Sequence, residues 1–254
     1  MNTDLKKDGG FQYLEVGEGT PIVILHGLMG NLSNFEGVLD FFPPKGYKVL
    51  MPALPIYDLP LIKTNVKNLA KFVKEFIEYK ELKDYLLMGN SLGGHISLYF
   101  AKLYPKELKG MILTGSSGLY ENAMGGSFPR RGDYDYVTKK IQDVFYDDAI
   151  ATKEIIDESF ATINDRSKLI RILALAKSAI RHNMSKDLPD LNMPVCLIWG
   201  KNDVVTPPNV ADEFNELLPN SDLYWIDKCG HTPMMEHPDK FNEIIEEWFK
   251  KTNI

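Results

Sequence analysis

The sequence predicts an α/β fold, in which helices cover both faces of a mostly parallel sheet and a helical segment is inserted. Short apolar runs alternate with helix-like stretches early in the chain, which is typical of parallel strands joined by right-handed crossovers. Between about residues 119 and 188 helix patterns alone remain, and apolar strands then resume. We therefore expect a core domain formed by residues 1–118 and 189–254, with residues 119–188 as a helical cap.

Composition indicates a globular protein. The 254 residues are 44% hydrophobic and 25% charged, which allows a sizeable core and argues against disorder. The net charge of −6 and the absence of long Lys/Arg clusters disfavour nucleic acid and anionic membranes as partners. A small-molecule substrate is the expected partner, and the oligomeric state is left open.

The sequence also bears on cellular location. Residues 1–10 are polar and lack the apolar stretch of a secretion signal, and no later run approaches the length of a membrane span. Cys196 lies in a strand pattern and Cys229 in a loop, which suits reduced thiols better than a disulfide scaffold. We therefore expect a cytoplasmic protein.

Apolar periodicity predicts the elements before the insertion. Residues 11–16 alternate apolar and polar side chains, as an antiparallel edge strand does, whereas residues 21–25 are apolar throughout and suit a central strand. The other expected elements are a short helix over 34–42, a strand over 47–51, an amphipathic helix over 65–79, a strand from residue 85, a helix over 95–103 and a strand over 109–114.

The insertion and the segments after it follow the same logic. A glycine-rich loop over 122–127 is either a mobile lid edge or a simple connector. Helix patterns cover residues 136–146, 153–163 and 167–180. Beyond the insertion we expect strands over 194–199 and 221–226 and helices over 208–218 and 238–251.

A candidate nucleophile lies in the turn Gly89-Asn90-Ser91-Leu92-Gly93. This G-x-S-x-G pattern follows an apolar run and precedes a helix pattern, the setting in which a serine is presented at a sharp strand-to-helix turn. The N–H of Leu92 opens the helix and would point at the space before the hydroxyl. The alternative is a structural glycine-rich turn.

A serine hydroxyl needs a base, and the base needs an orienting carboxylate. Asp203 follows one apolar strand and His231 follows the next, so both would reach the same rim of the sheet as Ser91. The alternatives are a turn residue for Asp203 and a hydrogen-bonded loop histidine for His231. Three other histidines, in less favourable positions, are His95, His182 and His237.

The loop after the strand 21–25 supplies a second candidate for the oxyanion hole. The backbone N–H of Leu28 would lie at the same rim of the sheet, while His26 is better interpreted as a loop histidine bonded within the structure. The histidines and cysteines lack metal-ligand spacing, and neither G-x-G-x-x-G nor a P-loop is present. We therefore expect no metal and no cofactor.

Taken together, these motifs resemble the α/β-hydrolase superfamily across essentially the whole chain. The resemblance is carried by His26-Gly27, by the turn around Ser91, by Gly200-Lys201-Asn202-Asp203 and by Gly230-His231. It implies an eight-stranded, mostly parallel sheet with a helical cap over the site and no cofactor. Relatives with an aspartate nucleophile are disfavoured because this turn carries a serine.

Three functions remain open. A Ser-His-Asp triad with two N–H donors suits a carboxylesterase of small neutral acyl esters, which is the leading hypothesis. The turn and the tail around His231 also resemble the carbon–carbon hydrolases of aromatic meta-cleavage products, although Thr232 stands where those enzymes usually carry tryptophan and Ser159 where they carry a cap arginine. A non-enzymatic ligand receptor is the third. The cap aromatics that could roof an apolar pocket are Phe128, Tyr134, Tyr136, Phe145 and Phe160.

Overall fold

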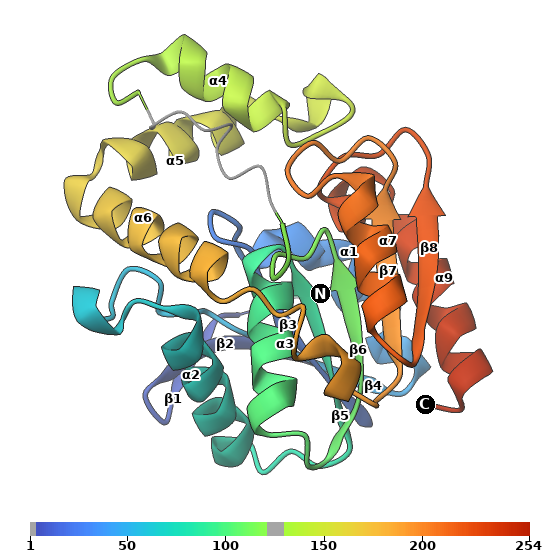
Figure 1. The fold of residues 1–254 in the computed structure, drawn as a ribbon. Helices are drawn as coiled ribbons and strands as arrows, with labels where there is room; N and C mark the ends of the chain where they lie inside the picture. Colours follow the sequence, from blue (N-terminus) through green and yellow to red (C-terminus); the bar gives the residue numbers. More distant parts are fainter. Residues whose placement is uncertain (1–3, 121–129) are drawn as a thin grey trace.

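An eight-stranded sheet forms the centre of the protein in the computed structural model, which describes residues 4–120 and 130–254 (Figure 1). Its order is β1-β2-β4-β3-β5-β6-β7-β8, and every pair from β4 to β8 is parallel. The strands are β1 (Lys6–Asp8), β2 (Phe11–Val16), β3 (Thr20–Leu25), β4 (Tyr47–Pro52), β5 (Tyr85–Asn90), β6 (Leu108–Thr114), β7 (Val195–Gly200) and β8 (Ser221–Ile226).

Helices cover both faces of this sheet. One hydrophobic core lies under α2 (Val66–Tyr79), α3 (Leu92–Leu103) and α7 (Pro208–Leu217). The other lies under α1 (Glu36–Phe41) and α9 (Pro238–Thr252). Strands β5 and β7 are buried along their whole length because both faces are covered, which explains why their sequences are apolar except for Asn90 at the end of β5. Short 3-10 segments cover Leu32–Phe35, Pro43–Lys45, Leu61–Lys63, Asp148–Ile150 and Leu188–Asp190.

Between β6 and β7, three α-helices interrupt the strand sequence in the part of the chain that the structure describes. They are α4 (Tyr134–Gln142), α5 (Lys153–Asn164) and α6 (Arg166–Arg181), and they lie together beyond one end of the sheet (Figure 1). They build small hydrophobic clusters of their own, one of which also includes Met29 from the loop after β3. A hydrogen bond from Asn31 to Glu158 at 3.3 Å adds a second contact to the same loop.

Two predicted positions are wrong at the start of the chain. Residues 11–16 form an antiparallel strand, but not an edge strand, because β1 pairs outside it. The three residues of β1 are polar and exposed, so no apolar pattern in the sequence predicts this strand. The predicted helix over 34–42 is a 3-10 turn followed by the short α1.

Two further differences lie near the site. The helix predicted over 136–146 ends at Gln142, because the backbone of Val144 and Tyr146 bonds to the segment around His231 instead of continuing the helix. A four-residue helix, α8 (Pro233–Glu236), begins two residues after that histidine and was not predicted. The expected glycine-rich loop over 122–127 lies outside the described residues. No helix in the described ranges has the length and apolar character that a membrane span requires.

Candidate active site

Ser91 lies at the point where β5 ends and α3 begins. Its backbone has φ 53° and ψ −118°, a conformation that costs energy in an L-residue and that is found where function requires it. The flanking glycines allow the turn: a Cβ on Gly89 would approach the Gly93 carbonyl carbon to 2.4 Å, and one on Gly93 would approach the Leu25 oxygen to 1.9 Å. The sequence pattern therefore forms the strained strand-to-helix turn that it predicted.

Backbone hydrogen bonds hold this strained residue in place. The Ser91 N–H donates to the Thr114 carbonyl at 3.1 Å. The Ser91 carbonyl accepts from the N–H groups of His95 at 3.2 Å and Ser117 at 3.1 Å. These bonds tie the turn to α3 and to the chain after β6, so the surrounding fold compensates for the local strain.

Asp203 and His231 are brought together as expected, since they follow β7 and β8. The Asp203 Oδ2 lies 2.9 Å from the His231 Nδ1, and the two residues are only 2% and 6% exposed. A buried carboxylate at this distance fixes the ring orientation and favours the tautomer that carries its proton on Nδ1, leaving Nε2 as the acceptor. This is the arrangement that a general base requires.

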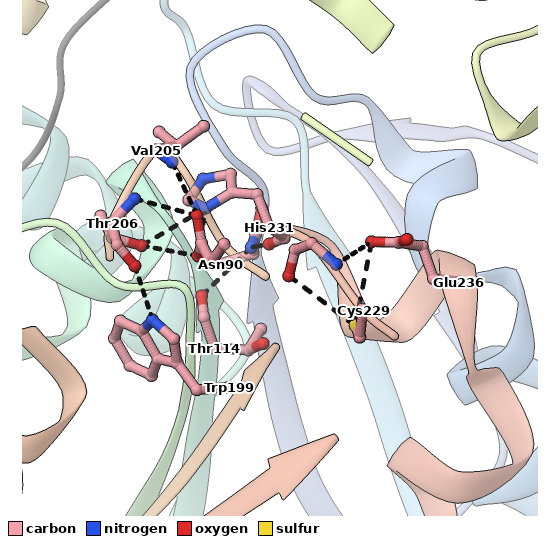
Figure 2. Close-up of polar contacts among 10 residues, drawn as sticks. Asn90, Thr114, Trp199, Val205, Thr206, Cys229, His231 and Glu236 are labelled. Carbon is pink, nitrogen blue, oxygen red and sulfur yellow. Dashed lines mark hydrogen bonds and ion pairs between the residues drawn. The ribbon is translucent and has the colours of Figure 1, made fainter. Parts of the chain in front are cut away.

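Thr206 and its neighbour Val205 donate the hydrogen bonds that hold the Asp203 carboxylate in place (Figure 2). The Asp203 Oδ1 accepts from the N–H groups of Val205 at 2.8 Å and Thr206 at 3.0 Å, and Oδ2 accepts from the Thr206 hydroxyl at 2.9 Å. The Thr206 carbonyl in turn accepts from the Trp199 indole at 2.9 Å. Thr206 was not predicted as a site residue, although a threonine three residues after a turn aspartate is a usable signal for such a loop.

Asn90 connects the turn of Ser91 to the loop of His231. Its side-chain amide donates to the carbonyls of Thr114 and His231, each at 3.1 Å (Figure 2). The His231 N–H donates to the Val144 carbonyl at 2.8 Å. Gly115 lets the ring approach closely, because a Cβ there would lie 2.8 Å from Nδ1. The residue just before the predicted nucleophile thus helps to position the predicted base.

The Leu28 loop runs past the nucleophile. A Cβ on Gly27 would lie 3.5 Å from the Ser91 Cβ, and the Gly30 N–H closes the turn onto the Gly27 carbonyl at 3.2 Å. Among the described residues, neither the Leu28 nor the Leu92 N–H has a hydrogen-bond acceptor. Two such N–H groups that point at the space in front of a nucleophilic serine would stabilise an oxyanion.

The contacts of the other histidines suit a structural role. Burial lowers the pKa of His26, whose Nδ1 donates to the Gly27 carbonyl at 2.9 Å and whose Nε2 accepts from the Leu54 N–H at 3.2 Å. His95 is fully buried in α3, His182 contacts the Ser178 hydroxyl at 3.2 Å, and His237 contacts the Lys228 carbonyl at 2.9 Å. Of the histidines, His231 is the one paired with a carboxylate within the described part of the chain.

Comparison with known proteins establishes the family. A family model described as the alpha/beta hydrolase fold matches residues 20–169 and 137–238, and the protein therefore belongs to the α/β-hydrolase family. The chain is 52% identical to MGS-MChE2, an alpha/beta hydrolase enzyme from the metagenome of sediments from the lagoon of Mar Chica, Morocco. That likeness covers 99% of this chain and 100% of the other, with a TM-score of 0.83.

Two curated relatives have more specific names. A 2-hydroxy-6-oxononadienedioate/2-hydroxy-6-oxononatrienedioate hydrolase of Pseudomonas sp is 26% identical, over 96% of this chain and 93% of that protein. Lipase 3 of Moraxella sp. (strain TA144) is also 26% identical, over 86% of this chain and 73% of its own length. The protein is thus a hydrolase enzyme, and its relatives include proteins named as a lipase and as a hydrolase of 2-hydroxy-6-oxononadienedioate.

Proposed function

We propose that the protein is a serine hydrolase that cleaves small, neutral carboxylic esters through an acyl-enzyme. The contact between Asp203 and His231 at 2.9 Å, on the rim where the strained Ser91 turn lies, is the observation that carries this proposal. A nucleophile, a base with an orienting carboxylate and two N–H donors are the groups that acyl transfer needs.

The proposed reaction has two halves. The Ser91 hydroxyl attacks the ester carbonyl while the His231 Nε2 takes its proton, and the N–H groups of Leu28 and Leu92 donate to the oxyanion. The protonated ring then gives the proton to the leaving alkoxide, which departs as an alcohol. Water attacks the acyl-enzyme with His231 again as base, and its proton passes to Ser91 as the carboxylic acid leaves.

Residues 119–188 would serve as the cap that selects the substrate, with residues 1–118 and 189–254 as the catalytic core. In support, α4 to α6 contact the loop of Leu28 through Met29 and Asn31, and the loop of His231 through Val144. The described cap aromatics, Tyr134, Tyr136, Phe145 and Phe160, pack mostly with one another and with the cap's own clusters. Other apolar groups of the insertion would therefore have to face the site, where they would favour uncharged acyl groups, since an unpaired buried carboxylate is costly.

Carbon–carbon hydrolysis of meta-cleavage products is the second candidate. It is favoured by the relatedness to the Pseudomonas enzyme along nearly the whole chain, and the same serine, histidine and aspartate would serve it. The residues that weigh against it are Thr232 and Ser159, which stand in place of a tryptophan and an arginine of those enzymes. Without a cation at position 159, a dienoate carboxylate would need another partner.

Kinetics on both substrate classes test the proposal. We expect kcat/KM for p-nitrophenyl butyrate to exceed that for 2-hydroxy-6-oxo-6-phenylhexa-2,4-dienoate by at least about tenfold. Turnover should continue over many cycles, whereas a receptor would give at most one slow event. The Ser91→Ala protein is the control and should lack both turnover and labelling by a fluorophosphonate. A tenfold advantage for the dienoate would establish the second candidate instead.

A further inference from the structure

The carboxylate of Glu236 accepts hydrogen bonds from two distant parts of the backbone. Its Oε1 accepts from the Gly230 N–H at 2.8 Å, and its Oε2 accepts from the Tyr146 N–H at 2.7 Å. Gly230 immediately precedes His231, while Tyr146 belongs to the segment between α4 and α5. Bonds to a carboxylate are shorter and stronger than those between neutral groups, so this side chain is a firm bridge between the two segments.

Other contacts join the same two segments beside this bridge. The His231 N–H donates to the Val144 carbonyl at 2.8 Å. A Cβ on Gly230 would lie 2.5 Å from that carbonyl oxygen, so only glycine fits the approach. Met235, next to Glu236, packs against the cluster formed by Phe145, Ala151 and Ile156. The loop that carries the base is therefore held against the inserted segment through its backbone.

We propose that Glu236 is a positioning residue that holds the His231 loop against residues 144–146. It thereby couples the position of the helices α4, α5 and α6 to the position of the base. The inference rests on the proposed function of His231. Glu236 acts through the backbone of Gly230 and has no part in the bond-making steps above. Movement of the inserted helices upon substrate entry would reach the imidazole through this bridge.

The chemistry of the side chain makes the proposal specific. A carboxylate only accepts hydrogen bonds, so both of its oxygens can serve an N–H group. A glutamine at this position would present an NH₂ group to one of the two donors and lose one bond, although its shape is nearly the same. Alanine would lose both bonds.

The test compares Glu236→Gln and Glu236→Ala with Glu243→Gln, an exposed glutamate of α9 whose carboxylate lies 3.6 Å from Lys240. Reaction with a fluorophosphonate gives two readings: its final extent counts folded, competent protein, and its rate constant reports on the positioned base. A misplacement of about 1 Å can cost about 100-fold in rate. We therefore expect rate constants and kcat to fall about tenfold for Glu236→Gln and about 100-fold for Glu236→Ala. Extent and KM should stay near wild type, as should every reading of Glu243→Gln.

A second variant approaches the same contact from the other side. Gly230→Ala would push the Val144 carbonyl away and should lower the rate constant as well. Because both changes loosen one contact, Gly230→Ala combined with Glu236→Ala should cost less than the product of the separate effects.

Two outcomes would overturn the proposal. One is a wild-type rate constant in both Glu236 variants. The other is a lower extent of labelling or lower thermal stability with an unchanged rate constant per labelled site, which would make Glu236 a structural residue only. Failure of the proposed function looks different, since labelling would then persist in Ser91→Ala.

Discussion

The hydrogen bond between Asp203 and His231 is the contact on which the proposed chemistry depends most. Replacing Asp203 with asparagine keeps the shape but can present a donor to Nδ1, which favours the wrong tautomer of the ring. We expect kcat to fall by about 10³–10⁴-fold in Asp203→Asn, and by a comparable amount in His231→Ala. Steady-state kinetics, with the extent of fluorophosphonate labelling as a control for folding, measure both.

Activity should also rise as the pH is raised, because His231 must be neutral to accept the serine proton. A pH profile of kcat/KM checks this expectation. A mild loss in His231→Ala, together with a severe one in His95→Ala or His237→Ala, would assign the base elsewhere.

The residues proposed to act in the reaction could be located from the sequence, whereas the residues that position them could not. Ser91, Asp203 and His231 follow apolar strands at recognisable turns, so their location at one rim could be argued from strand direction alone. Asn90 and Glu236 bond to backbone atoms contributed by other segments. Such partners depend on how loops meet in space, and no periodicity in the sequence encodes that.

Helix α3 contains a buried group whose titration should appear in the stability of the whole fold. His95 is fully buried, and neither ring nitrogen makes a hydrogen bond of normal geometry with the described residues. Burial lowers the pKa of His95 to about 4, against an ordinary value of 6.5. Between pH 6.5 and 4 the unfolded chain therefore binds a proton that the folded protein does not, and stability falls as pH falls.

Replacing His95 with leucine should remove this dependence. At pH 7.5 the free energy of unfolding should change little, because only a weak contact between the ring and the His182 backbone is lost. As the pH falls from 6.5 to 4, the wild type should lose up to ~3 kcal/mol of its free energy of unfolding through His95, and the variant should not. Urea unfolding at a series of pH values measures the difference, with His237→Gln as a matched histidine control. Parallel pH curves for the wild type and His95→Leu would contradict the assignment.

Among the elements, prediction succeeded where burial leaves a clear pattern. The central strands and α2, with its cap residue Asn65, agree with expectation to within a residue or so. Prediction from the sequence failed for β1 and α8, which are three and four residues long. Elements of that length have no period to detect, and they are fixed by the neighbours they pair with or follow.

For the molecule as a whole, exchanging the insertion tests whether the core domain carries out catalysis while the insertion selects the substrate. All five candidate site groups lie outside residues 119–188. We expect a chimera that carries the corresponding segment of the Pseudomonas relative, but keeps residues 144–146 of this chain, to label at Ser91 within about threefold of the wild-type rate.

The ratio of kcat/KM for the ester and the dienoate should by contrast change by about tenfold or more in the chimera. The Ser91→Ala chimera is the control for hydrolysis that does not use the site. An unchanged ratio in a chimera that labels normally would place substrate selection in the core domain rather than in the insertion.

The short strand β1 has a consequence for association between molecules. An open sheet exposes unpaired N–H and C=O groups along its outermost strand, and a long apolar strand there invites another chain to add to it. The outermost strand here has three residues, Lys6, Lys7 and Asp8, all exposed, and Lys6 pairs with Glu15 of β2 at 3.0 Å. It covers part of the longer and more apolar β2 with a stretch too brief and too charged to nucleate further pairing. This edge is thereby protected against aggregation, at the expense of three residues that contribute nothing to the core.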